Sequence, residues 1–315
     1  MKYEHYFTSS LMRATDLIIT AFIFTLLCTA CIGAHRIPDW ETHAYYLLLA
    51  GILFAALSWL SRNMDQNAAS FALRVIIILS VSSYLFQAVG PLQHVLFKQW
   101  FDDFLISMEA SITGTEMSIY LQQFTTPSLT EWMMFCYVIY IVLLPLTAYL
   151  CYRHAGRTAG EQYLLNLAAV NIICYSGFIL LPVKSPLFYM PDVYSVPLDG
   201  GIFTWCGEWI RANQHYPGGA LPSPHAAAGT IMLFSIFRFA RRYVYLYLPI
   251  ILTIYVATVY GRYHYSWDIL AGISTAVLVT RITPSIRTKV VLWESFIRRK
   301  SLLSNELINQ KGGMS

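Results

Sequence analysis

The chain has 315 residues, of which 57% are hydrophobic and 12% are charged, and its formal net charge is +4. Soluble domains carry roughly 25% charged residues, so this composition excludes an ordinary soluble fold and indicates an integral membrane protein. Basic residues lie between hydrophobic segments rather than along one face with aromatic residues, so we expect no nucleic-acid partner. The six cysteines show no Cys/His spacing typical of zinc sites, and we expect neither a metal nor a cofactor.

Membrane-spanning helices need about 20 mostly apolar residues. In chain order, the segments with this character are 16–34, 42–60, 70–92, 130–152, 164–183, 223–240, 243–260 and 266–283. The first segment is long, lacks a clear small-residue cleavage site and precedes further spans, so we interpret it as a retained helix rather than a signal peptide. The sequence therefore predicts an all-α integral membrane protein with about eight transmembrane helices.

Two segments outside the spans have a distinct composition. Residues 95–112 mix aromatic, aliphatic and acidic side chains, which predicts an amphipathic helix lying on the outer membrane surface. A solvated helix packed on the loops is the alternative. Residues 284–315 are polar and basic and are predicted to form a cytoplasmic tail.

The distribution of basic residues predicts the orientation. With a cytoplasmic N-terminus and eight spans, 16 of the 21 Lys and Arg residues lie on the cytoplasmic side, as the positive-inside rule requires. The loops 184–222 and 261–265 then face the periplasm, the lumen or the exterior. No Asn-x-Ser/Thr sequon occurs, which suits a bacterial inner membrane.

The first outward motif is LPSPHAAAG at 221–229. Ser223 is a favourable helix N-cap, and Pro224 suits the first helical position. His225 then lies in the first turn, where free backbone N–H groups and the helix dipole favour a phosphate. The small residues 226–229 leave room for a head group or for close helix packing.

The second outward motif is YGRYHYSWDILAG at 260–272. His264 and Asp268 are four residues apart and share one face of a helix. An unpaired carboxylate near the start of an apolar span is costly, and the imidazole N–H is an obvious partner. This pairing would fix the tautomer of His264 and leave its other nitrogen free to attack. Arg262 adds a cation at the same place.

Two non-enzymatic interpretations fit the sequence less well. A transporter or channel would need ionisable residues deep inside several spans, whereas those of this chain lie mostly near the span ends. A haem- or metal-binding membrane protein would pair histidines in the middle of its helices, whereas His225 and His264 lie at helix starts. Two histidine motifs on one predicted side favour catalysis over a structural role.

Pro222-Ser223-Pro224-His225 and His264-x3-Asp268 resemble the second motif and the core of the third motif of the type 2 phosphatidic acid phosphatase superfamily. The resemblance covers a six-helix core at 70–283, and residues 1–69 add two N-terminal helices. Lys184 matches the lysine of the first motif, but Pro191 stands at its arginine position. Ala257 and Thr258 replace the Ser-Arg of the third motif. The chain is therefore most similar to the branch that holds inositol phosphorylceramide synthase.

The resemblance implies a metal-free reaction on a phosphate-bearing lipid in the membrane. His264 would attack the phosphorus, Asp268 would orient His264, and His225 would act as general acid and base. The implied phosphate-binding residues are Lys184, Ser223 and Arg262. A lipid alcohol as acceptor would make the protein a phosphotransferase, and water would make it a lipid phosphatase. The missing arginines favour the transferase, because a diester donor carries less charge than a monoester.

Overall fold

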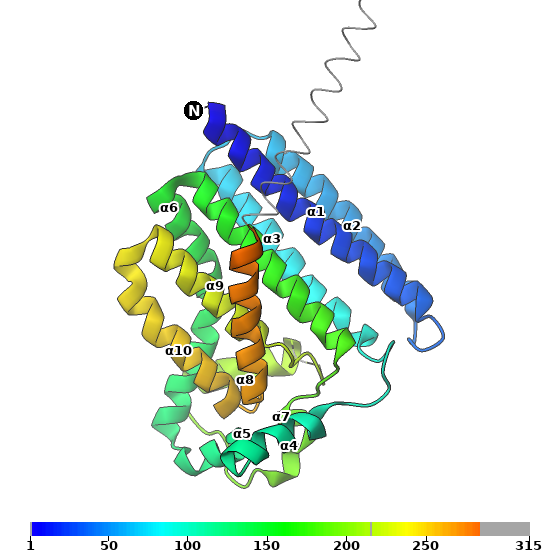
Figure 1. The fold of residues 1–315 in the computed structure, drawn as a ribbon, viewed down its shortest axis with the longest axis vertical. Coiled ribbons are helices and arrows are strands. Elements are labelled where there is room, and N and C mark those ends of the chain that lie inside the picture. Colours follow the sequence, from blue (N-terminus) through cyan, green and yellow to red (C-terminus); the bar gives the residue numbers. More distant parts are fainter. Residues whose placement is uncertain (1, 215, 284–315) are drawn as a thin grey trace, which may run out of the picture.

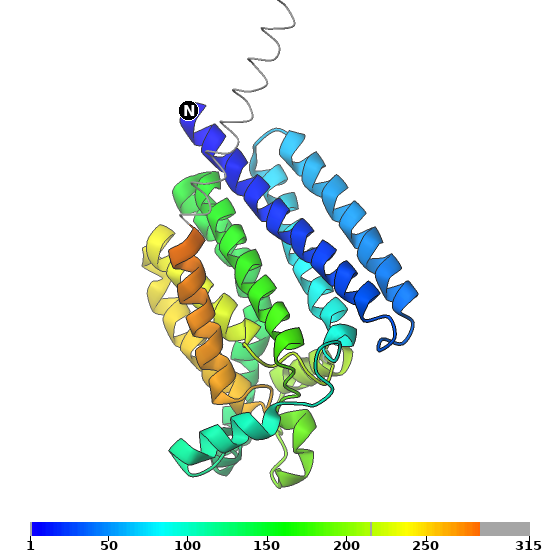
Figure 2. The same cartoon turned by 45° about the vertical axis from the view of Figure 1, so that its right-hand side comes forward.

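The computed structural model describes residues 2–214 and 216–283, and of residues 2–7 and 214 it describes the backbone alone. The described residues are mostly helical and include no strand. The long helices form one bundle, and shorter helices gather at one end of it, as Figures 1 and 2 show. We call this end, which holds α4, α5, α7 and α8, the site end. The predicted tail 284–315 lies outside the described residues.

The N-terminal part of the bundle consists of α1 (Lys2–Ile32), α2 (Trp40–Asn63) and α3 (Ala68–Val89). A buried ion network holds these helices to α6 (Pro127–Leu180). Arg74 of α3 is fully buried and binds Asp16 of α1, and its Nε lies 3.4 Å from Glu161 of α6. Charges withdrawn from water in this way need their partners, so the network ties the N-terminal helices to the rest of the protein.

Helix α6 has 54 residues, but it is two antiparallel arms. Ala155 and Gly156 have non-helical dihedral angles, and Gly156 has a φ of 78°, which side-chain-bearing residues adopt at a cost. The chain reverses there, and the Tyr163 hydroxyl donates to the Leu144 carbonyl across the arms at 3.1 Å. The arms, 127–154 and 157–180, correspond to the predicted fourth and fifth spans.

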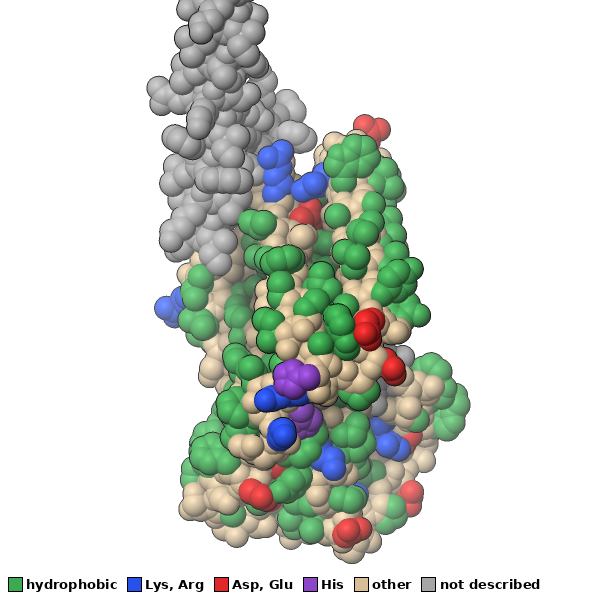
Figure 3. All heavy atoms as spheres, turned by 90° about the vertical axis from the view of Figure 1, so that its right-hand side faces the viewer, with side chains coloured by type: hydrophobic (Ala, Val, Ile, Leu, Met, Phe, Trp, Pro, Cys, Tyr) green, Lys and Arg blue, Asp and Glu red, His purple; other side chains and the backbone are tan. Residues whose placement is uncertain are grey.

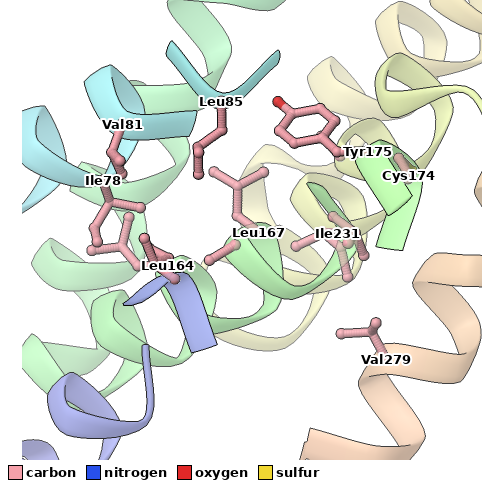
Figure 4. Packing of buried hydrophobic residues seen from close by; sticks show 14 of the residues in the cluster. Ile78, Val81, Leu85, Leu164, Leu167, Cys174, Tyr175, Ile231 and Val279 are labelled. Carbon is pink, nitrogen blue, oxygen red and sulfur yellow. The ribbon is translucent and has the colours of Figure 1, made fainter. Parts of the chain in front are cut away.

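The bundle is completed by α9 (Pro224–Phe239), α10 (Val244–Tyr260) and a last described helix at 266–283. Its core joins helices that are distant in the sequence. Figure 4 shows Leu85 of α3, Leu167 and Tyr175 of α6, Ile231 of α9 and Val279 of the last helix in this core.

Hydrophobic side chains also cover the outside of the bundle. Figure 3 shows them over the helical part of one face, with charged side chains gathered at its top and over its lower third. Five described helices are long and apolar enough to cross a membrane, with α6 counted once. Each predicted span coincides with a helix or with one arm of α6. The all-α membrane architecture is confirmed.

The site end contains α4 (Asp102–Thr113), α5 (Met117–Leu121), α7 (Pro186–Tyr189), α8 (Ile202–Gln214) and several 3-10 turns. Helix α4 begins at Asp102, later than the predicted start at residue 95. Its buried Leu105 packs with Val183 and Tyr265, while Phe104 and Ile112 are exposed. The helix therefore packs on the loops of the site end with one face.

Candidate active site

The two histidine motifs meet at the site end, although 39 residues separate His225 from His264. The Ser223 amide donates to the Asp268 carbonyl at 2.9 Å, which joins the start of α9 to the start of the last helix. Gly272 permits this contact, because a Cβ there would lie 2.5 Å from the Ser223 carbonyl oxygen. The packing of these helix starts therefore sets the spacing between the motifs.

His264 and Asp268 form the predicted pair, but His264 lies in the turn before the last helix, which begins at residue 266, and not on one face of a helix with Asp268. His264 Nδ1 lies 3.3 Å from Asp268 Oδ2, and this oxygen also accepts a hydrogen bond from the Tyr265 amide at 2.9 Å. Both side chains are buried. The Thr258 carbonyl accepts hydrogen bonds from the backbone amides of Tyr263 and His264. With Nδ1 directed at a carboxylate, Nε2 is the nitrogen left to act as a nucleophile.

His225 stands in the first turn of α9, as predicted. Ser223 caps the helix, since its Oγ accepts from the Ala226 amide at 3.3 Å, and Pro224 follows at the first helical position. The His225 ring packs against Tyr140 with 4.8 Å between ring centroids, and its centroid lies 5.7 Å from that of His264. The two imidazoles are close enough to act on the same phosphorus.

A cavity of about 530 Å³ contains both histidines in its wall. The cavity extends from the histidines between α3 and the two arms of α6. Its volume is typical of ligand sites. Asp268 lies behind His264 and does not line it. Lys184, Ser223 and Arg262 do not line it either, although each is next in sequence to a lining residue: Ser185, Pro224 and Tyr263.

A family model described as the PAP2 superfamily matches residues 103–282, which is more than half of the chain. The chain belongs to the PAP2 superfamily. No curated protein and no solved structure matches it significantly. The matched region contains α4 from its second residue onward, both arms of α6 and both histidine motifs, so the resemblance seen in the motifs is confirmed at the level of the superfamily. This PAP2 protein is therefore a membrane enzyme of the lipid phosphatase and phosphotransferase class.

The cations predicted for this PAP2 site lie beside the cavity rather than in its wall. The Arg262 guanidinium stacks over the Tyr194 ring at 4.0 Å and donates to the Val196 carbonyl. The backbone of Arg262 has a positive φ of 67°. Lys184 is half-buried, and its backbone amide donates to Asp102. In Ser223, the hydroxyl already serves as the helix cap.

Asp102 is a positioning residue that the sequence analysis did not identify. Its carboxylate accepts hydrogen bonds from the amides of Lys184 and Ser185 at 2.8 and 3.1 Å and from the Tyr265 hydroxyl at 2.8 Å. Burial raises the pKa of Asp102, and these hydrogen bonds oppose the rise. Asp102 thereby joins α4 to the loop after α6, which carries Lys184, and to the turn that carries His264 and Tyr265. The helical spacing of Asp102, Leu105 and Glu109 was the available signal, since all three share the buried face of α4.

Glu131 is a second positioning residue that the sequence analysis missed. Its carboxylate accepts hydrogen bonds from the backbone amides of Gly201, Phe203 and Thr204 at 2.7 to 3.0 Å. These amides belong to the start of α8, so Glu131 attaches that helix to α6. No local pattern identifies this role, because the partners are some 70 residues away.

Proposed function

We propose that this protein is a lipid phosphotransferase, which moves a phosphorylated head group from a donor lipid to a lipid alcohol through a phosphohistidine on His264. One observation supports this above the others. His264, backed by Asp268, faces His225 across 5.7 Å in the wall of a cavity that extends between the membrane-spanning helices.

The proposed first step is attack by His264 Nε2 on the lipid phosphorus. The bond from phosphorus to the leaving oxygen breaks, and His225 gives that oxygen a proton. Asp268 accepts the Nδ1–H hydrogen bond and stabilises the charge that the imidazole gains. In the second step the acceptor hydroxyl attacks phosphorus, His225 takes its proton, and the N–P bond breaks to restore His264.

The developing negative charge on the phosphate oxygens needs nearby donors. We propose that Ser223 contributes by capping α9, whose N-terminal end carries partial positive charge beside His225, and that Lys184 and Arg262 supply cations. Ala257 and Thr258 stand where two residues of the usual phosphate motif would be. This smaller positive charge favours a diester donor, as in inositol phosphorylceramide synthesis.

Lipid phosphate hydrolysis is the second candidate function. Arg262 adjoins Tyr263 in the sequence, and Tyr263 stacks on Tyr137 beside His225. Arg211, which pairs with Glu208, lies on α8 next to the cavity-lining Ile210. Two cations beside the cavity suit a monoester such as phosphatidic acid or an isoprenyl phosphate, because a monoester carries more charge. Water would then resolve the phosphohistidine.

We also propose that the site end faces the periplasm, in a bacterial inner membrane, or the equivalent outer side of another membrane. The asymmetry of Lys and Arg supports this orientation. Cys31 lies exposed at the end of α1 that is nearest the site end. A membrane-impermeant maleimide should label Cys31 in intact spheroplasts, and labelling only after permeabilisation would contradict the orientation.

The activity is tested with purified protein in detergent. Phosphatidic acid, phosphatidylinositol and an isoprenyl phosphate are each supplied with and without ceramide or diacylglycerol, and products are identified by mass spectrometry. His264→Ala is the inactive control. The matched variant is His154→Ala, which removes an exposed histidine that contacts Arg242 far from the site.

A new phospholipid that needs the added acceptor would establish the transferase. Free phosphate released from the monoesters would establish the phosphatase. In both cases His154→Ala should retain activity. Equal product in the wild type and in His264→Ala would overturn the proposed mechanism.

A further inference from the structure

The cavity continues beyond the histidines along three helix faces. The first arm of α6 contributes residues at helical spacing, and so does the second arm, where Leu167, Asn171 and Tyr175 are successive turns. Helix α3 supplies the third face. The Tyr175 hydroxyl donates to the Ser82 carbonyl at 3.1 Å and holds α3 against the second arm. This part of the cavity is therefore a built feature of the bundle.

Its wall is not uniformly apolar. Asn171 and Ser82 line the cavity and are each 8% exposed. No hydrogen bond joins either side chain to another described residue, and neither has a polar atom among the fully buried unpaired ones, so their polar atoms are accessible from the cavity. In a cavity surrounded by membrane-spanning helices, a polar group without a hydrogen-bonding partner costs about 1–3 kcal/mol. A bound molecule that supplies hydrogen-bonding partners would remove this cost.

A backbone acceptor lies in the same wall. Pro145 and Ile141 both line the cavity, and Pro145 has no N–H to donate to the carbonyl four residues earlier, that of Ile141. Four lining residues are exposed on the outside of the spanning helices: Ser80, Ser83, Ile141 and Pro145. The cavity therefore opens sideways between α3 and the first arm of α6, at a depth where the surroundings are lipid.

The polar groups also lie at a suitable depth. Asn171 is one helical turn, about 5 Å, further from the site end than Tyr175, and Tyr175 shares the cavity wall with Tyr140, which packs on His225. The ester or amide linkage of a phospholipid is only a few bonds from its phosphate. A lipid with its phosphate at the histidines would bring that linkage toward Asn171 and Ser82.

We propose that Asn171 and Ser82 form a subsite for the ester or amide linkage and adjacent hydroxyl of a glycerolipid or sphingolipid, and that the cavity selects such lipids over polyisoprenoids. A polyisoprenoid chain offers these side chains no hydrogen-bonding partner. The assignment narrows the substrate class of the proposed function and rests on that function only for the identity of the site.

The test measures binding rather than turnover, so that it does not depend on the proposed chemistry. The Tm of the purified protein is followed as ceramide, diacylglycerol or a polyprenol is added. The variants are Asn171→Leu and Ser82→Ala. Asn166→Leu is the matched control, because Asn166 lies on the same arm and bonds Gln162 instead of lining the cavity.

Ceramide or diacylglycerol should raise the Tm of the wild type and of Asn166→Leu, and the polyprenol should not. Asn171→Leu should raise the half-saturating lipid concentration by about tenfold, the effect of losing one hydrogen bond worth about 1.4 kcal/mol, and Ser82→Ala should raise it by less. Equal stabilisation by the polyprenol, or a wild-type response in both cavity variants, would overturn the assignment. Activity that persists in His264→Ala would instead refute the catalytic proposal and leave this one standing.

Discussion

Replacing Asp268 with Asn tests the catalytic pair most directly. The carboxylate lies 3.3 Å from His264 Nδ1 and is fully buried. At this distance, and with an effective dielectric constant of about 20, one negative charge stabilises an imidazolium by about 5 kcal/mol. In Asp268→Asn a neutral amide oxygen can take the place of Oδ2 and accept from both Nδ1–H and the Tyr265 amide, but the negative charge that stabilises the imidazolium is lost.

The expected result is a fall of about 10³- to 10⁴-fold in the rate of phosphohistidine formation, which corresponds to 4–5 kcal/mol. The assay is single-turnover rapid quench with a labelled lipid, in which the acid-labile phosphoenzyme is measured directly. Asp65→Asn makes the same change at an exposed loop position and should leave the rate unaltered. A rate within tenfold of the wild type, in Asp268→Asn protein with an unchanged Tm, would refute the assigned role.

Three further changes have defined outcomes. Arg262→Ala should lower kcat/KM by about 10²-fold, Arg262→Lys should recover part of the loss, and wild-type kinetics in Arg262→Ala would exclude a role in phosphate binding. Burial raises the pKa of Glu109; hydrogen bonds from Ser266 oppose this shift, and the charge of Glu116 adds to it. The folded state therefore binds more protons than the unfolded state, and the free energy of unfolding falls as the pH rises above about 4. Glu109→Gln should therefore have a higher Tm than the wild type at pH 7, and this difference should vanish near pH 4; a constant difference would contradict the shift. Arg74→Met should lower the free energy of unfolding by about 3 kcal/mol, because Asp16 and Glu161 lose their shared cation, whereas the exposed Arg153→Met should not.

The sequence alone determined the features that depend on neighbouring residues. Composition and apolar length placed the chain in a membrane and located its helices, because these properties add up along one segment. The cap at Ser223 and the first-turn position of His225 follow from spacings within one helical turn, and His264 pairs with Asp268 across the short turn that leads into the last helix. Together with the motif order, these local features were enough to indicate the superfamily.

Tertiary structure decided everything that depends on contacts between distant segments. The cavity exists because α6 folds back at Gly156 and packs both arms beside α3. Asp102 became a positioning residue only when α4 packed against the loops that carry Lys184 and Tyr265. Arg262 contacts the Tyr194 ring from a left-handed backbone conformation that no local sequence pattern predicts. Such contacts depend on how whole helices pack, and no pattern within one segment encodes that packing.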